Sequence, residues 1–250
     1  MLAARRYDRI LEVLRSESVA EVGHLAQVLG VSETTVRRDL GHLADQGVIS
    51  RVRGGARGRT TPEPSYAQVA ARPHVDRDAI AEAAATLVND GDVLLLDIGT
   101  TVHAVATLLR GRELTVVTSS LAVLETLADE SGIELVLLGG SVRRNYRSTV
   151  GYLTEHALEH IHTQRLFLGT SGVHPDGSSW DTSVVEVPIK QAMMRAADEV
   201  VLLAGPDKFP GSGLARVCGP EDVDVLICRE GTHPATLEVF AEAGCRVVRA

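Results

Sequence analysis

The sequence predicts two folded units of different class: a small helical unit with a β-hairpin over residues 1–56, and a larger α/β domain with a mostly parallel sheet over residues 74–250. The first region shows apolar residues at helical spacing, and the second alternates short apolar runs with amphipathic segments. Between them, residues 57–73 begin with RGRTTPEPS, which carries two prolines and no apolar periodicity. This stretch predicts a linker.

Composition favours a folded protein outside the membrane. The chain has 250 residues with 44% hydrophobic content, enough for one large core or for one small and one medium core. No apolar run reaches the length of about 18 residues that a membrane span needs, and residues 1–15 lack the apolar core of a signal peptide. We therefore expect a cytoplasmic protein with no membrane partner. Cys218, Cys228 and Cys245 lie in or beside apolar segments without paired spacing, which predicts buried free thiols.

Charge is distributed unevenly along the chain, whose net charge is −8. Residues 1–60 hold 10 arginines against 7 acidic residues, a balance of +3, whereas residues 61–250 hold 15 basic against 26 acidic residues, a balance of −11. A basic head on an acidic body indicates that nucleic acid is a partner of the head alone.

The head carries three predicted helices. Residues 5–14 place apolar side chains at helical spacing, and residues 21–29 form a second amphipathic stretch that ends at Gly30, a residue suited to a helix C-terminus. Ser32 is a suitable N-cap for a third helix. The apolar face of this third helix consists of Val36, Leu40 and Leu43.

Other positions of the third helix carry hydroxyl and guanidinium groups, from Thr34, Thr35, Arg37 and Arg38. Arginine can bond guanine bidentately, and threonine can bond a base or a phosphate or contact the thymine methyl group. Two helices joined by a tight turn, with these groups on the second helix, predict a helix-turn-helix that enters the major groove. The alternative is an ordinary three-helix domain whose arginines form a solvated face.

A basic hairpin is predicted after Gly47. Residues 48–53 alternate apolar and polar side chains like a strand, and Gly54-Gly55 allows a sharp reversal. Such a wing suits phosphates beside the groove, and together with the arginine pair it favours DNA binding over the three-helix alternative. The predicted DNA-binding residues are Ser32, Thr34, Thr35, Arg37, Arg38, Arg51, Arg53, Gly54 and Gly55.

Over residues 5–56 the head resembles the winged helix-turn-helix of the DeoR family of bacterial transcription regulators. The resemblance rests on VSETTVRRDL at 31–40, on L-x-x-x-G at 43–47 and on R-x-x-G-G-A at 51–56. It implies that this segment reads DNA.

The body contains seven short apolar runs: VLLLD (93–97), LTVVT (114–118), ELVLL (134–138), RLFLG (165–169), VVLLA (200–204), DVLIC (224–228) and RVV (246–248). The predicted helices are 78–88, 102–110, 121–129, 153–161, 186–197 and 234–243. Continuous apolar strands separated by helices predict a mostly parallel sheet that is covered on both faces.

Small and hydroxyl-bearing residues follow several of these runs. Ligands bind at the carboxyl ends of parallel strands, where hydroxyls and helix-start N–H groups favour an anion such as phosphate. Gly and Ser mark strand ends in many proteins, but several such loops at one edge favour a ligand site. Among 25 basic side chains only Lys190 and Lys208 are lysines, which indicates a compact ammonium for a phosphate or a sugar oxygen.

The body resembles the same family through D-x-G-T-T at 97–101, L-T-V-V-T-x-S at 114–120, L-L-G-G-x-x-R at 137–143, F-L-G-x-S-G at 167–172 and D-K-F at 207–209. In that family the body is a sensor domain similar to ribose-5-phosphate isomerases and CoA-transferases, and it usually binds a phosphorylated sugar or a related metabolite. Ser119 stands where the family often has Asn, and Gly-Pro-Asp precedes Lys208 where Asp-Ser-Ser is common. These departures leave the identity of the sugar open.

The strand ends and the resemblance together indicate a repressor of a sugar operon. A phosphorylated sugar or a related effector is expected to release this repressor from double-stranded DNA. One head binds too weakly to select a site in a genome, so we expect a homodimer or homotetramer. The predicted effector-binding residues are Asp97, Gly99, Thr100, Thr101, Ser119, Ser120, Gly139, Gly140, Arg143, Gly169, Ser171, Gly172, Glu186, Lys190 and Lys208.

Two other functions remain as alternatives. An isomerase-like enzyme would use Asp97, Glu186 or Asp207 as proton base and Lys208 on the phosphate, but it has no use for the head. The other alternative is a DNA-architectural protein that no ligand affects. His156-Ala-Leu-Glu-His160 matches a zinc-protease pattern, but such short motifs often occur by chance. The prediction is therefore a protein without catalytic residues, metal or cofactor.

Overall fold

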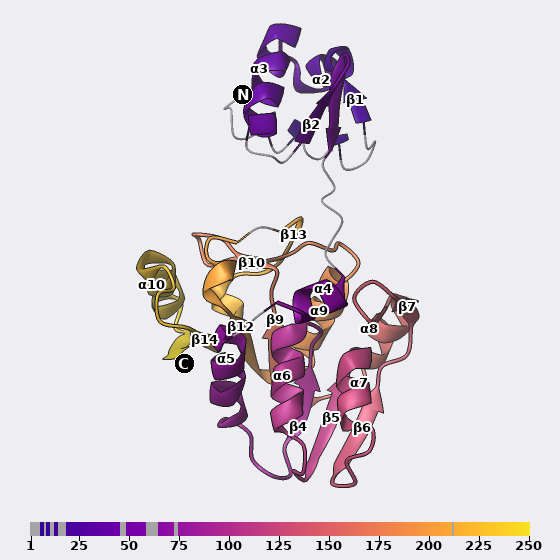
Figure 1. Cartoon of the computed structure of the whole chain (residues 1–250), viewed down its shortest axis with the longest axis vertical. Coiled ribbons are helices and arrows are strands. Elements are labelled where there is room, and N and C mark those ends of the chain that lie inside the picture. The colour runs from indigo at the N-terminus through magenta and orange to yellow at the C-terminus, as the bar shows by residue number, and fades with distance from the viewer. Residues whose placement is uncertain are drawn as a thin grey trace. The chain divides into compact units, whose positions relative to one another are not determined.

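In the computed structural model the described residues are 6–7, 9–10, 13–14, 19–45, 49–58, 65–72, 75–211 and 213–250 (Figure 1). The chain divides into two compact units, residues 1–63 and residues 64–250. These are called the N-terminal unit and the α/β unit and are described separately. Within the described residues, no helix has both the length and the apolar character needed to cross a membrane.

The described part of the N-terminal unit contains helices α2 (Val22–Leu29) and α3 (Glu33–Asp45) and strands β1 (Val19–Glu21), β2 (Ile49–Val52) and β3 (Gly55–Gly58). Helix α2 ends at Gly30, whose φ of 64° lies in the left-handed region. The Thr35 amide donates to Ser32 Oγ at 3.3 Å, so Ser32 caps α3 as predicted.

One apolar core joins these elements and includes the predicted face of α3, formed by Val36, Leu40 and Leu43. Strand β3 lies between β1 and β2 and is antiparallel to both, so the predicted wing is the β2–β3 hairpin with a third strand beside it. Within the predicted helix 5–14, residues 6–7, 9–10 and 13–14 are helical. Its other residues, and Gly47 and Val48 before the wing, lie outside the described residues.

The two glycines of the wing turn differ in their surroundings. A Cβ atom on Gly55 would lie 2.2 Å from the carbonyl oxygen of Ala20, whereas a Cβ atom on Gly54 would meet nothing within 4 Å. Gly54 has a φ of +80°, a conformation that costs an L-residue about 1–2 kcal/mol.

We predict that Gly55→Ala displaces β1 from β3 and lowers the thermal midpoint of the N-terminal unit more than Gly54→Ala does. Differential scanning calorimetry of the two full-length variants measures the difference. Equal midpoints would contradict the steric argument.

A seven-stranded parallel sheet forms the centre of the α/β unit, in the order β15-β14-β12-β9-β4-β5-β6. Each strand contains or overlaps one of the seven predicted runs. The strands are β4 (Val93–Leu96), β5 (Leu114–Thr118), β6 (Ile133–Leu137), β9 (Thr163–Gly169), β12 (Ala197–Ala204), β14 (Val225–Cys228) and β15 (Arg246–Arg249). Successive strands extend the sheet to one side of β4 and then to the other, so the direction of the strand order reverses between β4 and β9.

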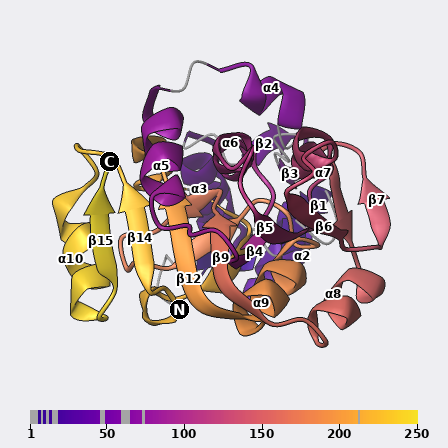
Figure 2. The same ribbon diagram turned by 90° about the horizontal axis from the view of Figure 1, so that it is seen from below.

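Helices cover both faces of this sheet (Figure 2). One face packs against α5 (Val75–Ala85), α6 (Thr100–Leu108) and α7 (Leu121–Leu127), and the other packs against α8 (Tyr152–Leu158), α9 (Val187–Arg195) and α10 (Pro234–Glu242). Neighbouring strand residues alternate between the two cores: Leu94 and Leu96 join the first, and Leu95 joins the second. The three cysteines are buried and free, as predicted.

Short elements complete the α/β unit, and the sequence did not predict them. They are the antiparallel hairpin β7 (Ser141–Arg143) and β8 (Ser148–Val150), the antiparallel sheet β10 (Gly172–Val173), β11 (Ser179–Asp181) and β13 (Ala215–Cys218), and the 3₁₀ turns η1 (Pro206–Lys208) and η2 (Pro220–Asp222). Elements of two to four residues are too short to show a period in the sequence.

The predicted linker, residues 57–73, carries structure at both ends. Strand β3 continues to Gly58, and helix α4 occupies Tyr66–Ala70. A capping box begins α4: the Gln68 amide donates to Ser65 Oγ at 3.3 Å, and the Ser65 amide donates to Gln68 Oε1 at 2.8 Å. Helix α4 belongs to the α/β unit, which begins at residue 64, so the predicted linker overlaps this unit.

Candidate functional sites

Helix α3 presents the predicted DNA-reading side chains on its outer face. Thr34, Arg37 and Arg38 are exposed, and Thr35 is half-buried. Arg37 Nη2 donates to Glu33 Oε2 at 2.9 Å, one helical turn earlier, and both side chains are 55% exposed. Such an exposed pair contributes little to stability, so Arg37 can exchange Glu33 for another partner at low cost.

An ion pair that the sequence did not predict anchors α3 from its inner side. Asp39 is 3% exposed and accepts two hydrogen bonds from Arg6, from Nε at 2.7 Å and from Nη2 at 3.0 Å. A bidentate pair fixes both position and orientation. Helix α3 is therefore anchored through its inner side, which leaves its outer face exposed.

The wing places Arg51 and Arg53 in exposed positions, as predicted, while Gly55 is buried against β1. The Gly54 carbonyl oxygen accepts from the Val22 amide at 2.9 Å and so joins the turn of the wing to the start of α2. The arrangement offers two cations on a hairpin fixed to the helix-turn-helix, which suits a phosphate backbone.

In the α/β unit, a buried ion pair lies at the carboxyl ends of β4 and β9. Asp97 is 1% exposed and Lys190 is 2% exposed, and Lys190 Nζ donates to Asp97 Oδ2. The Gly169 amide donates to the same carboxylate oxygen at 3.0 Å, and Lys190 Nζ also donates to the Gly169 carbonyl at 3.0 Å. Asp181 of β11 lies 3.6 Å from Nζ. Three predicted effector residues thus meet where the strand order reverses, the place where open α/β sheets bind ligands.

Electrostatics keep Lys190 charged. Burial alone lowers its pKa, but the carboxylates of Asp97, Asp181 and Glu186 raise that pKa by more. Asp181 was not predicted, because it lies in a three-residue strand that has no sequence signal.

A second buried carboxylate, Glu186, stands just before α9 and is 1% exposed. Its Oε1 accepts from Arg143 Nη1 at 2.9 Å and from the Ser148 hydroxyl at 2.6 Å. Burial raises the pKa of Glu186, while Ser148, Lys190 and Arg143 act in the opposite direction. The predicted residues Arg143 and Glu186 are therefore in contact, and Ser148 is a partner that the sequence did not indicate.

The small-residue loops lie at the same edge of the sheet. Gly99, with a φ of 109°, precedes α6 and Thr100, and the Ser120 hydroxyl caps α7 by accepting from the Val123 amide. Ser119 is fully buried, and its Oγ has no hydrogen-bond partner among the described residues. A Cβ atom on Gly140 would lie 2.2 Å from Thr154 Oγ1, so only glycine fits there.

Other predicted residues stay outside the buried cluster. Ser171 Oγ lies 3.4 Å from Thr182 Oγ1, and Gly172 is in β10. Lys208 lies in η1, is 29% exposed and pairs with Asp207 at 3.2 Å. The two lysines therefore differ: Lys190 is buried in its ion pair, whereas the ammonium of Lys208 remains accessible to solvent.

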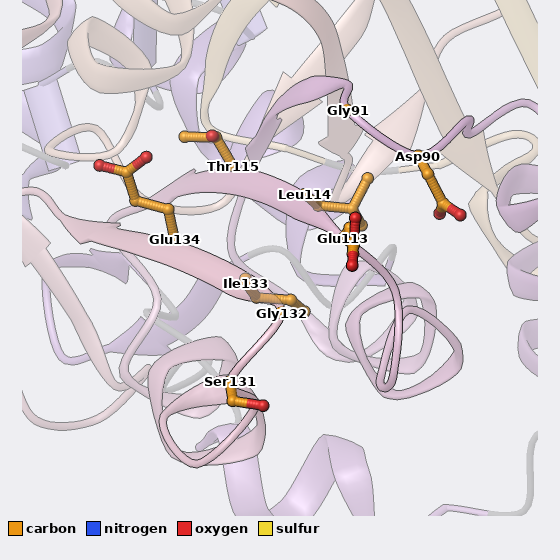
Figure 3. Close-up of a pocket in the computed structure, with 9 residues that line it drawn as sticks. All are labelled: Asp90, Gly91, Glu113, Leu114, Thr115, Ser131, Gly132, Ile133 and Glu134. Carbon is orange, nitrogen blue, oxygen red and sulfur yellow. The ribbon is translucent and has the colours of Figure 1, made fainter.

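Two cavities lie away from the buried ion pair. A cavity of about 680 Å³ opens at the amino-terminal ends of β5 and β6, and the acidic side chains of Asp90, Glu113 and Glu134 are among its lining (Figure 3). Negative charge of this kind does not suit an anionic effector. A cavity of about 510 Å³ lies between α4, α5 and α6, where Thr100 and His103 belong to its lining.

On the turn that ends α8, His156, Glu159 and His160 place one potential ligand atom each within 4.8 Å of one another, and all three side chains are exposed. His156 Nδ1 and Glu159 Oε2 are 2.9 Å apart and form a hydrogen bond. Exposed groups at helical spacing adopt this geometry without an ion, so the absence of a metal stays a prediction.

His103 of α6 is expected to make the stability of the α/β unit depend on pH. Its Nε2 lies 2.7 Å from Thr126 Oγ1. Burial lowers the pKa of His103 below 6.5, with a smaller contribution from the positive charges of Arg77 and Arg147. Protonation therefore favours the unfolded chain, and the free energy of unfolding decreases as the pH falls from about 6.5 towards the lower pKa of the folded state. The charged and aromatic groups around His103 are Arg77, Arg147, Glu125 and Tyr66.

We predict that the thermal midpoint of the α/β unit falls between about pH 7 and about pH 5.5, and that it falls less in a His103→Gln variant. Calorimetry across this range makes the comparison. An identical fall in both proteins would exclude His103 as the cause.

Comparison with known proteins matches both units. The DeoR-like helix-turn-helix domain model matches residues 6–61, and the DeoR C terminal sensor domain model matches residues 73–230. A putative aga operon transcriptional repressor of Escherichia coli O157:H7 is 30% identical over 98% of this chain and 93% of its own length. The HTH-type transcriptional repressor GlcR of Bacillus subtilis is 30% identical over 99% of this chain and 96% of its own length. A ribose 5-phosphate isomerase A structure from Methanocaldococcus jannaschii is 17% identical, with a TM-score of 0.39 over 53% of this chain and 52% of that chain.

Proposed function

Because this chain belongs to the DeoR family of transcription regulators, we propose that it represses a carbohydrate operon and leaves its operator when a phosphorylated sugar binds the α/β unit. That the chain is a DNA-binding regulator with a small-molecule sensor domain follows from the family itself. The operon class, the phosphate and the direction of the response are the proposal.

The observation that carries the DNA-binding part is the outer face of α3. Its exposed Arg37 and Arg38 project from a helix whose back is held by the Arg6–Asp39 pair, with Arg51 and Arg53 on a hairpin fixed to the same unit. A rigid helix with exposed guanidinium groups is what reading of base edges requires. We propose that Ser32, Thr34, Thr35 and the two glycines of the wing serve the same interface.

The effector is proposed to bind at the carboxyl ends of β4, β5, β6 and β9. The backbone at Gly99, where a Cβ would meet nothing within 4 Å, leaves room for close approach, and the accessible ammonium of Lys208 suits a phosphate. Asp97 and Glu186 border these strand ends and are proposed to position them through their buried ion pairs. A relative from Haemophilus influenzae, 28% identical over 95% of this chain, is named an L-fucose operon activator, which supports a carbohydrate as the effector class.

The enzyme alternative is not favoured, because the family and the names of the relatives indicate a regulator. Two carboxylates that it would use as proton bases are also already engaged: Asp97 with Lys190, and Glu186 with Arg143 and Ser148.

The regulator is proposed to act as a homodimer or homotetramer in the cytoplasm, where its operator lies. A single winged unit contacts too few base pairs to select one site in a genome, and paired units reading repeated half-sites overcome this limit.

The test is DNA binding by the full-length protein to its own upstream region at fixed salt, in the presence of glucose 6-phosphate, fructose 6-phosphate or ribose 5-phosphate. The matched controls are the unphosphorylated sugars and a random duplex. We expect specific binding that one sugar phosphate abolishes and its parent sugar does not. Equal affinity for operator and random DNA would overturn the proposal. Turnover of the sugar phosphate would favour the enzyme alternative. If no metabolite shifted the thermal midpoint of the α/β unit, the DNA-architectural alternative would be favoured.

A further inference from the structure

Helix α4 is held to the α/β unit mainly through Tyr66. This side chain is 6% exposed, whereas Ala67 and Gln68 are exposed and Val69 and Ala70 are half-buried. The Tyr66 amide donates to the Asn145 carbonyl oxygen at 2.9 Å. A helix of five residues is not stable alone in water, so α4 depends on its contacts with the α/β unit, of which the docking of Tyr66 is the most buried.

The docking of Tyr66 balances favourable ring contacts against an unpaired hydroxyl. The ring meets Tyr146 and His103 edge-on, with centroid separations of 6.1 and 6.0 Å, and the Arg147 guanidinium lies 5.7 Å from its centroid. The Tyr66 hydroxyl is buried and has no hydrogen-bond partner among the described residues. Burial of an unpaired hydroxyl is unfavourable, so the docked helix is only moderately favoured.

The hairpin that holds Tyr66 also holds Glu186. At the last residue pair of the β7–β8 hairpin before its turn, Arg143 and Ser148 both donate to Glu186 Oε1. At its tip, residues 145–147 contact Tyr66. The Arg143 guanidinium lies 5.5 Å from the centroid of the Tyr146 ring and so links the contact with Glu186 to the turn that holds Tyr66.

We propose that the β7–β8 hairpin couples the effector site to α4, so that a ligand that changes the Glu186–Arg143 pair changes the docking of Tyr66. This inference rests on the proposed function for its ligand, but the hairpin contacts do not depend on it. Coupling needs a two-state element that both sites bias, and the docked or released α4 is that element.

Release of α4 would alter the chain between the two units. Seven residues, 59–65, separate β3 from α4, and sixteen, 59–74, separate β3 from α5. At about 3.4 Å per extended residue, the maximum reach rises from about 25 Å to about 55 Å. Half-sites one DNA turn apart are spaced by about 34–36 Å, so tether length changes how closely two N-terminal units are held for joint binding.

Hydrogen exchange in the full-length protein tests the coupling without a ligand. The variants are Tyr66→Ala, Tyr66→Phe and Glu186→Gln, and the control is Tyr152→Ala, which changes a tyrosine of α8 that is 73% exposed. We expect amides 66–72 to exchange at least about tenfold faster in Tyr66→Ala and in Glu186→Gln, and no faster than wild type in Tyr66→Phe and Tyr152→Ala.

Amide exchange in β9 and β12 reports the global stability of the α/β unit. The comparison requires that the exchange rates in these strands be the same in each variant as in the wild-type protein. If Glu186→Gln unfolds the unit, the variant Ser148→Ala is used in its place, because it removes a hydrogen bond to the same carboxylate. Wild-type exchange at 66–72 in Glu186→Gln or Ser148→Ala, alongside fast exchange in Tyr66→Ala, would overturn the coupling.

A second arm measures operator affinity with and without glucose 6-phosphate, fructose 6-phosphate or ribose 5-phosphate. In the wild-type protein we expect one of these sugar phosphates to weaken operator binding at least about tenfold. In Tyr66→Ala we expect the same sugar phosphate to change operator affinity less than about twofold, although it still binds and raises the thermal midpoint. A full response in Tyr66→Ala would also overturn the coupling. A wild type that no sugar phosphate releases contradicts the proposed function instead, and the exchange experiment then decides the coupling by itself.

Discussion

Replacing Arg38 with alanine is expected to lower affinity for the operator by a factor of about 5–150 while changing affinity for random DNA much less. The guanidinium is exposed on α3 beside Arg37. One good bidentate contact to a base contributes about 1–3 kcal/mol of discrimination, which corresponds to that range. Fluorescence anisotropy with operator and random duplexes, at two salt concentrations, measures both affinities.

The matched control is Arg53→Ala in the wing, which is also exposed. An arginine that contacts phosphate is expected to weaken binding to both duplexes alike and to reduce the salt dependence by about one counterion. If Arg38→Ala behaved like Arg53→Ala, α3 would contact the phosphate backbone of the DNA and would not read bases.

Replacing Lys190 with methionine is expected to lower the free energy of unfolding by about 3–5 kcal/mol, because it leaves the buried carboxylates of Asp97, Asp181 and Glu186 without their ammonium partner. Since those carboxylates raise the pKa of Lys190, its contribution is complete below about pH 10.5 and is lost only as the pH rises through the higher folded-state value. Urea unfolding at neutral pH measures the loss.

The matched control is Lys208→Met, the other lysine of the chain. Lys208 is 29% exposed and Asp207 is 70% exposed, so breaking their pair is expected to cost less than about 1 kcal/mol. Its expected effect is weaker binding of the sugar phosphate at unchanged stability. Equal destabilisation by both substitutions would contradict the assignment of a structural role to Lys190 and a ligand role to Lys208. The double variant Asp97→Asn/Lys190→Met, which removes both charges, is expected to recover part of the lost stability.

The sequence predicted the main elements because their signals are local. The inner strands of the large sheet appeared as apolar runs, since a strand buried on both faces, such as β14, carries apolar residues at every position. Ser32 and Gly30 marked the ends of α3 and α2 through the chemistry of helix caps. The β7–β8 hairpin and α4 gave no such signal, because each is shorter than the window in which a period is visible.

Sequence by itself determined the class of each unit, the outward-facing side chains of α3 and the loops at the carboxyl ends of the strands. Only the tertiary structure decided which of these groups meet. Lys190 pairs with Asp97 across 93 residues, and Arg143 pairs with Glu186 across 43. These contacts depend on the reversal of strand order between β4 and β9 and on where α9 packs against the sheet. Local periodicity carries no information about that order, because apolar burial selects a face of the sheet and not the neighbour of a strand.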